Sequence, residues 1–403
     1  MLWTLKKKLY RTQHQVMKVA SAILPFPIPV LLTGPGSVGK LAENIRVRGL
    51  KHVMVVTDKV LMELKLADSL LESLTDNGIA YTVYDKVQPN PTIKNVEDGR
   101  TLYKKKKCDS LIGFGGGSSL DCAKIIGARL SNPYLSVRQM KGLFRVILPT
   151  PPLFCVPTTA GTGSETTVAA VISDPDTHEK FAISDLKLIP KIAVLDPELM
   201  VGLPPHITAA TGMDALTHAV EAYIGLNGNA FTDENAENAT RLIFENLEKA
   251  YTKGSDLKAR NNMALASFYG GAAFTRAYVG YVHAIAHNMG GMYGVPHGLA
   301  NAIILPYVLE FCQKEAEKKL ARLAIAGGIG KEGESEENLA HKFIKKVKEM
   351  NKKMKIPTSI KELKEEDIPL IAKRALDEAH PDYPVPRIMT LEECESLIRK
   401  LLP

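Results

Sequence analysis

The chain has 403 residues, of which 45% are hydrophobic and 24% are charged, so it is long enough for a large core and for two domains. Its formal net charge is +7, with lysines concentrated at 104–107 and between 345 and 355. Aromatic side chains do not alternate with these lysines, which therefore indicate solvated helix faces and argue against a nucleic-acid partner. Five scattered cysteines without a CxxC pair argue against disulfides and predict a cytoplasmic protein.

The first 27 residues combine basic side chains with an apolar run that superficially resembles a signal peptide. The run at 16–32 follows Lys6, Lys7, Lys8 and Arg11, but Lys18 and three prolines interrupt it. No stretch reaches the roughly 18 apolar residues that a membrane-spanning helix needs. We therefore predict an uncleaved N-terminal extension over residues 1–27, and no membrane partner.

Between residues 28 and 204, short β-rich runs alternate with helical segments. Several of these runs are apolar throughout, which is typical of strands buried on both faces of a parallel sheet. The alternation predicts an α/β domain over residues 28–204. The expected strands are 30–33, 52–57, 80–84, 110–113, 153–156 and 192–195.

A first glycine loop, 34–40, satisfies both the GxGxxG dinucleotide fingerprint and most of the GxxxxGK triphosphate loop. Leu41 stands where a triphosphate loop needs Ser or Thr for Mg²⁺, which disfavours an NTPase. Asp58 closes the strand at 52–57, about 20 residues downstream, where a carboxylate can bind a ribose 2′-hydroxyl. Because such a carboxylate would repel a 2′-phosphate, it favours NAD over NADP.

A second glycine loop, 113–119, follows an apolar run and leads into a helical segment. Its three consecutive glycines let backbone N–H groups approach a pyrophosphate at a helix N-terminus, so it is the stronger phosphate candidate. A third segment, 157–165, reads PTTAGTGSE after the strand at 153–156. Small polar side chains at the carboxyl end of a strand are suited to line a ligand crevice.

Beyond residues 203–205 the β pattern disappears and helical periodicity continues to the C-terminus. Examples are the segments 233–252, 257–277 and 336–354, and the only linker-like stretch is 327–335. The second half is therefore predicted to be an all-α domain, residues 205–403.

Five potential metal ligands lie close together in two helix-like segments of this half. The first segment contains Asp214 and His218, and the second contains His283, His287 and His297. Spacing of i, i+4 places Asp214 and His218 on one helix face, and likewise His283 and His287. A carboxylate with several imidazoles and no nearby cysteine suits Fe(II), Zn(II) or another divalent metal. On the residues alone, all five remain candidate ligands.

The motifs GFGGGSSLDCAK, PTTAGTGSE, DPELM, TGMDALTHAVEAY and HAIAHNMGGMYGVPHGLANAIILP occur in this order. With them the chain closely resembles the iron-dependent (group III) alcohol dehydrogenases, from about residue 28 to the C-terminus. The resemblance implies a Rossmann-like NAD-binding α/β domain followed by an all-α domain, the dehydroquinate synthase-like architecture. It also implies a cleft that holds NAD(P) and one divalent metal, with Fe(II) favoured and Zn(II) as the alternative.

The resemblance also assigns roles to individual residues. Asp214, His218, His283 and His297 would bind the metal, whereas His287 would lie beside the substrate and nicotinamide, where it could relay a proton. The glycine loop at 34–39 would then be mostly a structural turn. The implied cofactor contacts are Asp58, Asn90, Gly115, Gly116, Gly117, Ser118, Ser119, Thr158, Thr159, Thr162, Ser164, Lys180 and Leu199.

The implied reaction is reversible hydride transfer between a primary alcohol and NAD. Ala169 stands where some diol-reducing relatives carry a polar residue, and Phe274 and Val279 would also face the pocket. These three residues favour a simple aliphatic alcohol or aldehyde as the small-molecule partner. Family members commonly form homodimers, and some form larger assemblies.

Two other functions remain open. A metal- and NAD-dependent lyase or cyclase of the dehydroquinate-synthase type would need more basic side chains to bind an acidic substrate, and the segment 265–300 offers only Arg276. A non-enzymatic nucleotide-binding protein would keep the glycine loop but would not need the Asp/His set.

Overall fold

The computed structural model describes residues 2–177 and 179–403. Within these residues the chain divides into two units. One is an α/β unit formed by residues 26–203 and 255–264. The other is a helical unit formed by residues up to 25 and by 204–254 and 265–403.

The α/β unit is built on a sheet of six parallel strands in the order β1-β9-β6-β4-β2-β3. The predicted strands at 30–33, 80–84 and 192–195 have the observed limits, and the other three differ by one or two residues. These apolar runs form a parallel sheet because both faces of each central strand are buried. The strands are β1 Val30–Thr33, β2 His52–Val56, β3 Ala80–Tyr84, β4 Ser110–Gly115, β6 Leu153–Pro157 and β9 Ile192–Leu195.

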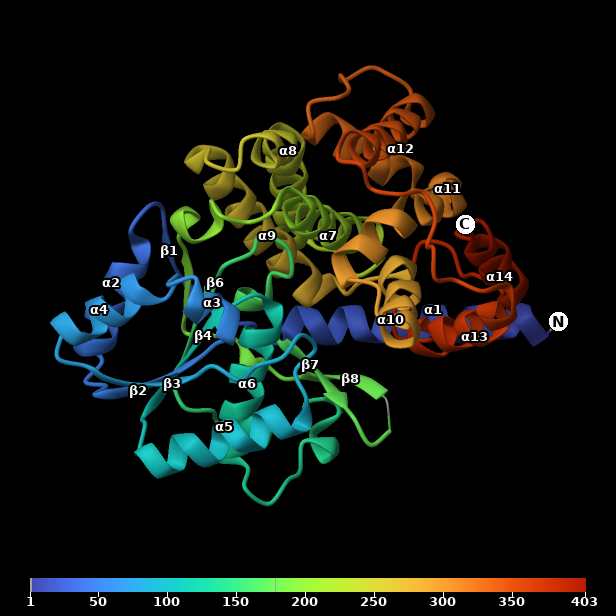
Figure 1. Ribbon diagram of the computed structural model, residues 1–403. Helices are drawn as coiled ribbons and strands as arrows, with labels where there is room; N and C mark the ends of the chain where they lie inside the picture. Colours follow the sequence, from blue (N-terminus) through green and yellow to red (C-terminus); the bar gives the residue numbers. More distant parts are fainter. Residues whose placement is uncertain (1, 178) are drawn as a thin grey trace. The chain divides into compact units, whose positions relative to one another are not determined.

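Helices cover both faces of this sheet (Figure 1). Strand β2 illustrates the alternation, because Val53 and Val55 belong to one buried cluster and Met54 and Val56 to another. Side chains of α2 (Ser37–Val47) and α4 (Asp68–Asp76) complete the first cluster. Side chains of α5 (Ile93–Lys106) and α6 (Gly117–Ser131) complete the second. The sheet is therefore the middle layer of a three-layer unit.

A second, three-stranded sheet in the order β5-β8-β7 was not predicted from the sequence. Its strands are β5 Gly142–Leu143, β7 Ala169–Asp174 and β8 Glu179–Ser184, and β7 pairs with β8 in antiparallel register. Both β7 and β8 expose part of one face, and the charged Lys180 of β8 lies on that face. Strands with one polar face lack the continuous apolar runs that made the main sheet recognisable.

The helical unit contains no strand among the described residues, in agreement with the predicted all-α second half. The predicted segments 233–252, 257–277 and 336–354 correspond to three of its helices, and the linker-like stretch 327–335 connects α11 to α12. Its helices after residue 204 are α7 Pro205–Ile224, α8 Ala230–Thr252, α10 Tyr281–Tyr293, α11 His297–Ala326, α12 Glu336–Lys353, α13 Ile368–Ala379 and α14 Leu391–Arg399. Residues 265–277 of α9 (Leu257–Ala277) also belong to it, whereas the start of α9 belongs to the α/β unit.

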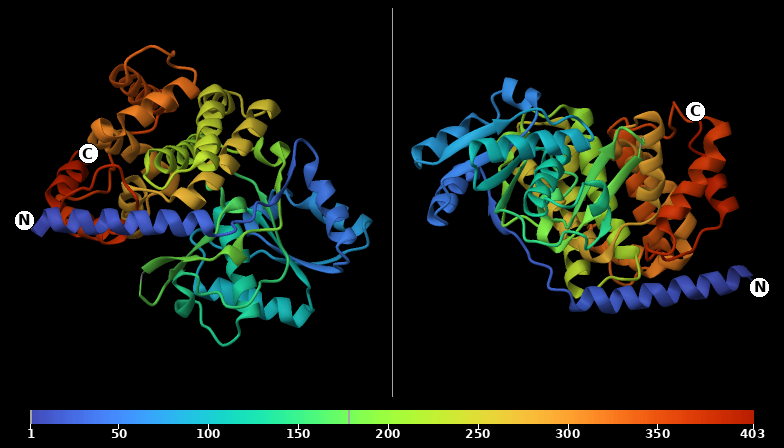
Figure 2. Two further views of the ribbon diagram at one scale, coloured as in Figure 1. Left: turned by 180° about the vertical axis from the view of Figure 1, so that it is seen from behind. Right: turned by 90° about the horizontal axis from the view of Figure 1, so that it is seen from below.

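The chain before the α/β unit contains a long helix, α1 (Leu2–Ile23), which the sequence did not predict (Figure 2). It belongs to the helical unit, with the C-terminal helices. None of the helices in the described part of the chain has the length and apolar character to cross a bilayer.

Candidate metal and cofactor sites

Three helices of the helical unit bring four of the five candidate ligands together. Helix α7 carries Asp214 and His218 one turn apart, α10 carries His283, and α11 begins with His297. One donor atom from each of these four side chains lies within 4.8 Å of the other three. This compact set of one carboxylate and three imidazoles fits a divalent transition metal.

The sequence suggested one helix for the second ligand segment, but the structure divides this segment into two helices. Gly294 ends α10 in the left-handed conformation, with φ 69°, and Pro296 precedes the first residue of α11. A glycine after the last turn and a proline at the next helix start are both typical of a helix break. The break reorients the chain, so that His297 approaches His283 from a different helix.

Glu221 is hydrogen-bonded to the ring of His283. It lies on α7, one turn after His218, and its Oε2 is 2.6 Å from His283 Nδ1. The same carboxylate accepts the backbone N–H groups of Gly280 and Val282, at 2.9 and 2.7 Å, and so fixes the start of α10. Burial raises the pKa of Glu221 to about 7, whereas burial and the neighbouring histidines lower the pKa of His283. A neutral His283 that donates Nδ1–H to Glu221 leaves Nε2 available to a metal.

Asn301 lies one turn after His297 on α11 and is fully buried. Its Nδ2 donates to Asp214 Oδ1 at 2.7 Å and lies 3.2 and 3.1 Å from Nε2 of His283 and His297. The bond to Asp214 orients a candidate carboxylate ligand from a neighbouring helix. The Nε2 lone pairs of His283 and His297 are those a metal would use, so Asn301 would not donate to them when the metal is bound.

Two glycines allow the helices to approach closely at this site. A Cβ atom on Gly298 of α11 would lie 2.5 Å from the carbonyl oxygen of Ala210 on α7. A Cβ atom on Gly270 of α9 would lie 3.1 Å from the carbonyl oxygen of Ala215 on α7. Both contacts involve backbone, which cannot move aside as a flexible side chain would.

His287 lies next to the four-residue set but is not part of it. Its ring stacks on that of His297 with 5.3 Å between centroids, and its Nδ1 lies 2.8 Å from Glu378 Oε1. Tyr383 donates its hydroxyl to the same Glu378 oxygen at 2.8 Å. Although burial raises the pKa of Glu378, His287 and Tyr383 together hold it below its usual value. The arrangement is a hydrogen-bonded chain from an imidazole to a carboxylate.

The three residues expected in the substrate pocket belong to different units. Phe274, on α9, stacks on the ring of His218 with 4.3 Å between centroids. Val279, between α9 and α10, is partly buried. Ala169 is the first residue of β7 in the α/β unit, where it is also partly buried.

In the α/β unit, the expected phosphate loop lies at the carboxyl end of β4. Gly115 has φ 140°, Gly116 precedes α6, and Gly117 is the first residue of that helix. A Cβ atom on Gly117 would lie 2.8 Å from Cγ2 of Thr162. Strands β6 and β2 flank β4, so the loops after these strands share its edge of the sheet. Open α/β sheets bind ligands at this edge.

Several of the implied cofactor contacts are joined by hydrogen bonds. Lys180 donates to Asn90 Oδ1 at 2.9 Å, and the backbone N–H of Asn90 donates to Ser118 Oγ at 3.2 Å. Thr158 N–H donates to the Gly115 carbonyl at 3.0 Å, and Ser164 donates to Asp121 at 2.7 Å. The remaining loop residues are Ser119, which is buried, and Thr159, which is partly buried next to Gly116.

Asp58 and Leu199 also lie in the α/β unit, where Asp58 caps a helix and Leu199 is part of the core. Asp58 caps α3 (Lys59–Glu63) by accepting the backbone N–H of Leu61 at 3.0 Å. Leu199 is 6% exposed and belongs to the buried cluster under α2 and α4.

Backbone N–H groups of the first glycine loop donate hydrogen bonds to carboxylates. Gly36 N–H donates to Glu198 Oε2 at 3.2 Å, and Val38 N–H donates to Asp196 Oδ2 at 3.1 Å. A helix N-terminus whose amides already bind carboxylates is poorly suited to a phosphate. This supports the structural role that the resemblance implied for the loop.

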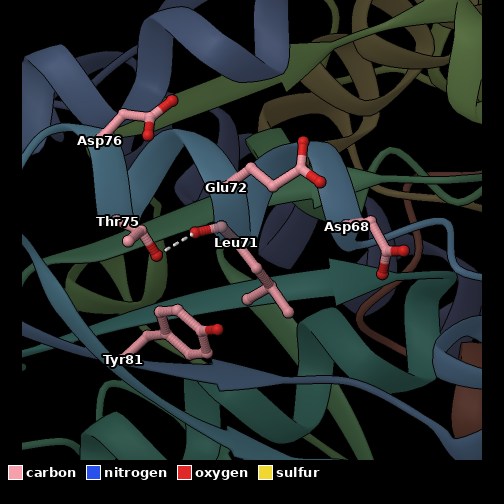
Figure 3. A pocket seen from close by; sticks show the side chains of 6 residues that line it. All are labelled: Asp68, Leu71, Glu72, Thr75, Asp76 and Tyr81. Atoms are coloured by element: carbon pink, nitrogen blue, oxygen red, sulfur yellow. Dashed lines mark hydrogen bonds between the residues drawn. The ribbon is translucent and has the colours of Figure 1, made fainter.

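The α/β unit also has a separate pocket of about 450 Å³ along α4 and β3 (Figure 3). Three carboxylates line it, those of Asp68, Glu72 and Asp76, together with Leu71, Thr75 and Tyr81. None of the predicted site residues is among them. Its acidic lining is unsuited to a dinucleotide phosphate.

Comparisons with known proteins identify the family. The model of the iron-containing alcohol dehydrogenase family matches residues 29–197, and the model of the C-terminal part of the Fe-containing alcohol dehydrogenase family matches residues 208–402. The chain belongs to the iron-containing alcohol dehydrogenase family. Within the family, it is 40% identical to alcohol dehydrogenase 4 of Schizosaccharomyces pombe over 91% of this chain and 86% of the relative.

Two further relatives of the family extend the comparison. The NAD-dependent methanol dehydrogenase of Bacillus methanolicus is 36% identical over 93% of this chain and 98% of its own. A crystal structure of 1,3-propanediol oxidoreductase superposes with a TM-score of 0.90 at 38% identity, covering 94% of this chain and all of that one.

The family membership confirms the predicted fold class and reaction class. The chain is an NAD-linked, metal-dependent alcohol dehydrogenase or aldehyde reductase. The comparisons do not favour the lyase or cyclase alternative, and Arg276, its one basic candidate, stacks on Phe231 at 4.3 Å from the ring centroid.

The sequence did not reveal three residues that hydrogen-bond to the candidate ligands or to His287. Glu221 follows His218 at i+3, and Asn301 follows His297 at i+4, so both share a helix face with a ligand. This spacing could have identified them. Glu378 is 91 residues from His287 in the chain, and no local pattern marks it.

Proposed function

We propose that this enzyme interconverts short primary aliphatic alcohols and their aldehydes, with NAD as the hydride acceptor or donor. The observation that carries the proposal is the set of four donor atoms within 4.8 Å, with a fourth histidine, His287, beside it. Relatives named as methanol and 1,3-propanediol enzymes support short primary alcohols as the substrate class.

We propose Asp214, His218, His283 and His297 as the ligands of one divalent metal. Their donor set and the carboxylate of Glu221 behind His283 fit such an ion. When bound, the ion supplies Lewis-acid chemistry, which favours the ionised form of an alcohol and polarises a carbonyl. The family name supports Fe(II), and Zn(II) is the alternative because the same donors accept it.

His287 is proposed as the proton carrier. Its hydrogen bond to Glu378 fixes the ring, and Nε2 then points away from that carboxylate. A side chain held in this way can accept the proton of an alcohol, directly or through water, and return it in the reverse direction. Glu378 and Tyr383 position the ring in this scheme.

The dinucleotide is proposed to lie along the carboxyl edge of the six-stranded sheet. The amides at the start of α6 would bind its pyrophosphate, next to Thr158, Thr159, Thr162 and Ser164. Asn90, Lys180 and Leu199 would complete the contacts. Asp58 would bind the adenosine ribose, which supports NAD over NADP because its carboxylate would repel a 2′-phosphate. When bound, the nicotinamide exchanges hydride with the substrate.

Ala169, Phe274 and Val279 offer no polar group to a second hydroxyl, which favours simple alcohols over diols. We propose that residues 28–204 serve as the cofactor domain and 205–403 as the metal and substrate domain, following an extension at 1–27. We further propose a cytoplasmic homo-oligomer with no nucleic-acid or membrane partner.

The experiment is a screen of NADH absorbance with methanol, ethanol, 1-propanol, 1,3-propanediol and their aldehydes, each with Fe(II), Zn(II) or chelator. We expect turnover that depends on metal, falls with chelator and is faster with NAD than with NADP. Absence of any hydride signal with either metal would refute the proposed function.

The His287→Ala variant tests the proton carrier. We expect it to bind metal as the wild type does but to lose most of its turnover, by about 10²–10⁴-fold. Metal content is measured by elemental analysis and turnover at saturating substrate over a range of pH. An unchanged rate would show that the proton leaves by another route.

A further inference from the structure

Helix α1 has two faces with different surroundings. On one face, Arg11 donates to the carbonyl oxygens of Val385 and Pro386 at 2.6 and 2.7 Å. His14, which is 2% exposed, has Nε2 2.8 Å from the Pro381 carbonyl oxygen. The ring of Tyr10 lies 5.1 Å from that of His380. These contacts attach α1 to the segment between α13 and α14.

The opposite face of α1 carries large apolar side chains in solvent. Leu5, Leu9, Val16, Val19 and Ile23 are 62–77% exposed. With Thr12, their positions are 5, 9, 12, 16, 19 and 23, so the steps alternate between four and three residues. This alternation is the a/d pattern of a coiled coil, extended over almost the whole helix. We call these six residues the α1 stripe.

The α1 stripe lies nearly opposite the attached face. If the stripe occupies the a and d positions of the heptad, then Trp3, Tyr10, His14, Met17 and Ser21 occupy b and f positions, which lie on the outer side of a coiled coil. All five of these residues are partly or fully buried. Helix α1 can therefore be attached on one side and pair with another helix on the other.

The width of the stripe decides which kind of partner fits it. A helix that lies in a membrane interface needs a broad apolar face, whereas an a/d-only stripe is the narrow seam of a coiled coil. Along residues 5–16 of α1, charged or amide side chains border the stripe, namely Lys6, Lys8, Gln13 and Gln15, and only the small Ala20 and Ala22 follow at the equivalent positions. The stripe is thus suited to one helix of similar width.

We propose that the α1 stripe is an interface between two copies of this chain, in which the two α1 helices pair in antiparallel orientation. In an antiparallel coiled coil, a residues of one helix meet d residues of the other. The stripe is self-complementary in this arrangement, because Leu5 meets Ile23 of the second copy, Leu9 meets Val19, and Thr12 meets Val16. Each layer then contains at least one branched apolar side chain.

The charges of α1 select this orientation over the parallel one. The helix has basic residues at 6, 7, 8, 11 and 18 and no acidic residue. Three of these cations occupy the second turn, close to the positive end of the helix dipole. Parallel pairing would place the two lysine clusters side by side. Antiparallel pairing places each cluster beside the negative C-terminal end of the other helix.

The first test compares Val16→Lys with Thr4→Lys, because both add one charge at an exposed position of α1 but only Val16 is in the stripe. Sedimentation velocity over a range of concentrations measures the mass of each. We expect the wild type and Thr4→Lys to share one assembly, and Val16→Lys to have half its mass with unchanged melting temperature. Equal masses for all three would refute the interface.

The second test determines orientation by oxidative cross-linking. All five native cysteines are buried, so they contribute little background. The antiparallel register predicts covalent dimers for Leu9→Cys combined with Val19→Cys, and none for either substitution alone. Dimers formed by Leu9→Cys alone would indicate parallel pairing and contradict the proposal.

A third measurement addresses the membrane as the competing partner. The wild type and Val16→Lys are mixed with vesicles of phosphatidylcholine alone or with phosphatidylserine, and the bound fraction is measured by flotation. We expect both proteins to remain unbound. Binding by the wild type that Val16→Lys loses, together with equal masses in solution, would assign the stripe to anionic lipid and overturn the proposal.

Discussion

Glu221 serves two purposes with one carboxylate. It binds the ring of His283 and the two amides that begin α10, so a single side chain fixes both a candidate ligand and the helix that carries it. Second partners of this kind orient metal-bound histidines and raise their basicity. The buried position of Glu221 makes that arrangement sensitive to its charge.

The Glu221→Gln variant should therefore bind metal more weakly. Glutamine keeps the size of the side chain but removes the negative charge that holds His283 Nδ1–H. We expect Zn(II) affinity to fall by about 10- to 100-fold, measured by competition with a chromophoric chelator. Glu378→Gln is the matched control, because Glu378 contacts His287 outside the four-residue set. It should keep wild-type affinity, and equal affinities for all three proteins would contradict the role of Glu221.

Glu165 predicts a pH dependence of stability in the α/β unit. Burial raises the pKa of Glu165 to about 7, although a hydrogen bond from its own backbone amide and the charge of Lys124 act to lower it. Because the folded state holds this proton more tightly than the unfolded state, the free energy of unfolding falls as pH rises from about 4.5 to 7. Below that window both states are protonated, and above it both are ionised.

The Glu165→Gln variant should lack this contribution. Denaturation by urea at pH 5 and pH 7.5 is expected to show a smaller loss of stability with rising pH, by up to about 3 kcal/mol relative to the wild type. Glu72→Gln, at an exposed position of the same unit, is the control and should follow the wild type. Identical pH profiles for all three proteins would mean that Glu165 is ionised in the folded state at pH 5.

Only part of the candidate site could be predicted from the sequence, and the reasons are physical. Asp214 and His218 were recognisable as a pair because i, i+4 spacing places their side chains on one helix face, whereas the resemblance, and not the spacing, selected His283 and His297 over His287. Glu221 and Asn301 carry a similar local signal. The contact between His287 and Glu378 depends on how α10 and α13 pack, and packing between distant segments leaves no spacing rule in the chain.

The helices of the site are held together by close backbone approach. At Gly298, the first turn of α11 lies against the carbonyl of Ala210 on α7, and a Cβ there would also lie 3.2 Å from Cβ of Asp214. The distance between Asp214 and His297 therefore depends on the absence of a side chain at this one position. The sequence predicted these helical segments, but it did not predict the distance between them.

Gly298→Ala should push α11 away from α7 and weaken metal binding. We expect loss of stability of about 1–3 kcal/mol from overpacking, together with a loss of Zn(II) affinity. Gly291→Ala, in α10 and facing open space, is the control. It should leave affinity unchanged and raise stability by about 0.5–1 kcal/mol, as alanine does within a helix. Normal metal affinity in Gly298→Ala would contradict the close-approach argument.

Across the whole chain, the order of elements was easier to predict than their grouping. Continuous apolar runs identified the six-stranded sheet, and helical periodicity identified the second half. The sequence did not indicate that α1 belongs with the C-terminal helices, or that residues 255–264 group with the α/β unit. Both depend on contacts between segments that are far apart in the chain, as does the three-stranded sheet.

The two units should respond separately to their ligands. Hydrogen exchange of the metal-free protein is expected to slow in α7, α10 and the start of α11 when Zn(II) is added. Addition of NAD should instead slow exchange in the loops at 113–119 and 158–164. A ligand at 100 times its Kd can stabilise its site by about 2.7 kcal/mol, which exchange readily detects. Protection by Zn(II) confined to the glycine loops would contradict the assignment of the sites.

The donor set has a consequence for charge balance. Imidazole ligands bind a metal in their neutral form, so the Asp214 carboxylate would be the one anionic ligand among these four residues. A divalent ion held by these side chains would therefore retain a formal surplus of about one positive charge. Such a surplus attracts any small anion that fits, not only an ionised alcohol. We therefore expect halide, azide and carboxylate ions, including those of a buffer, to compete with the ionised alcohol at this centre.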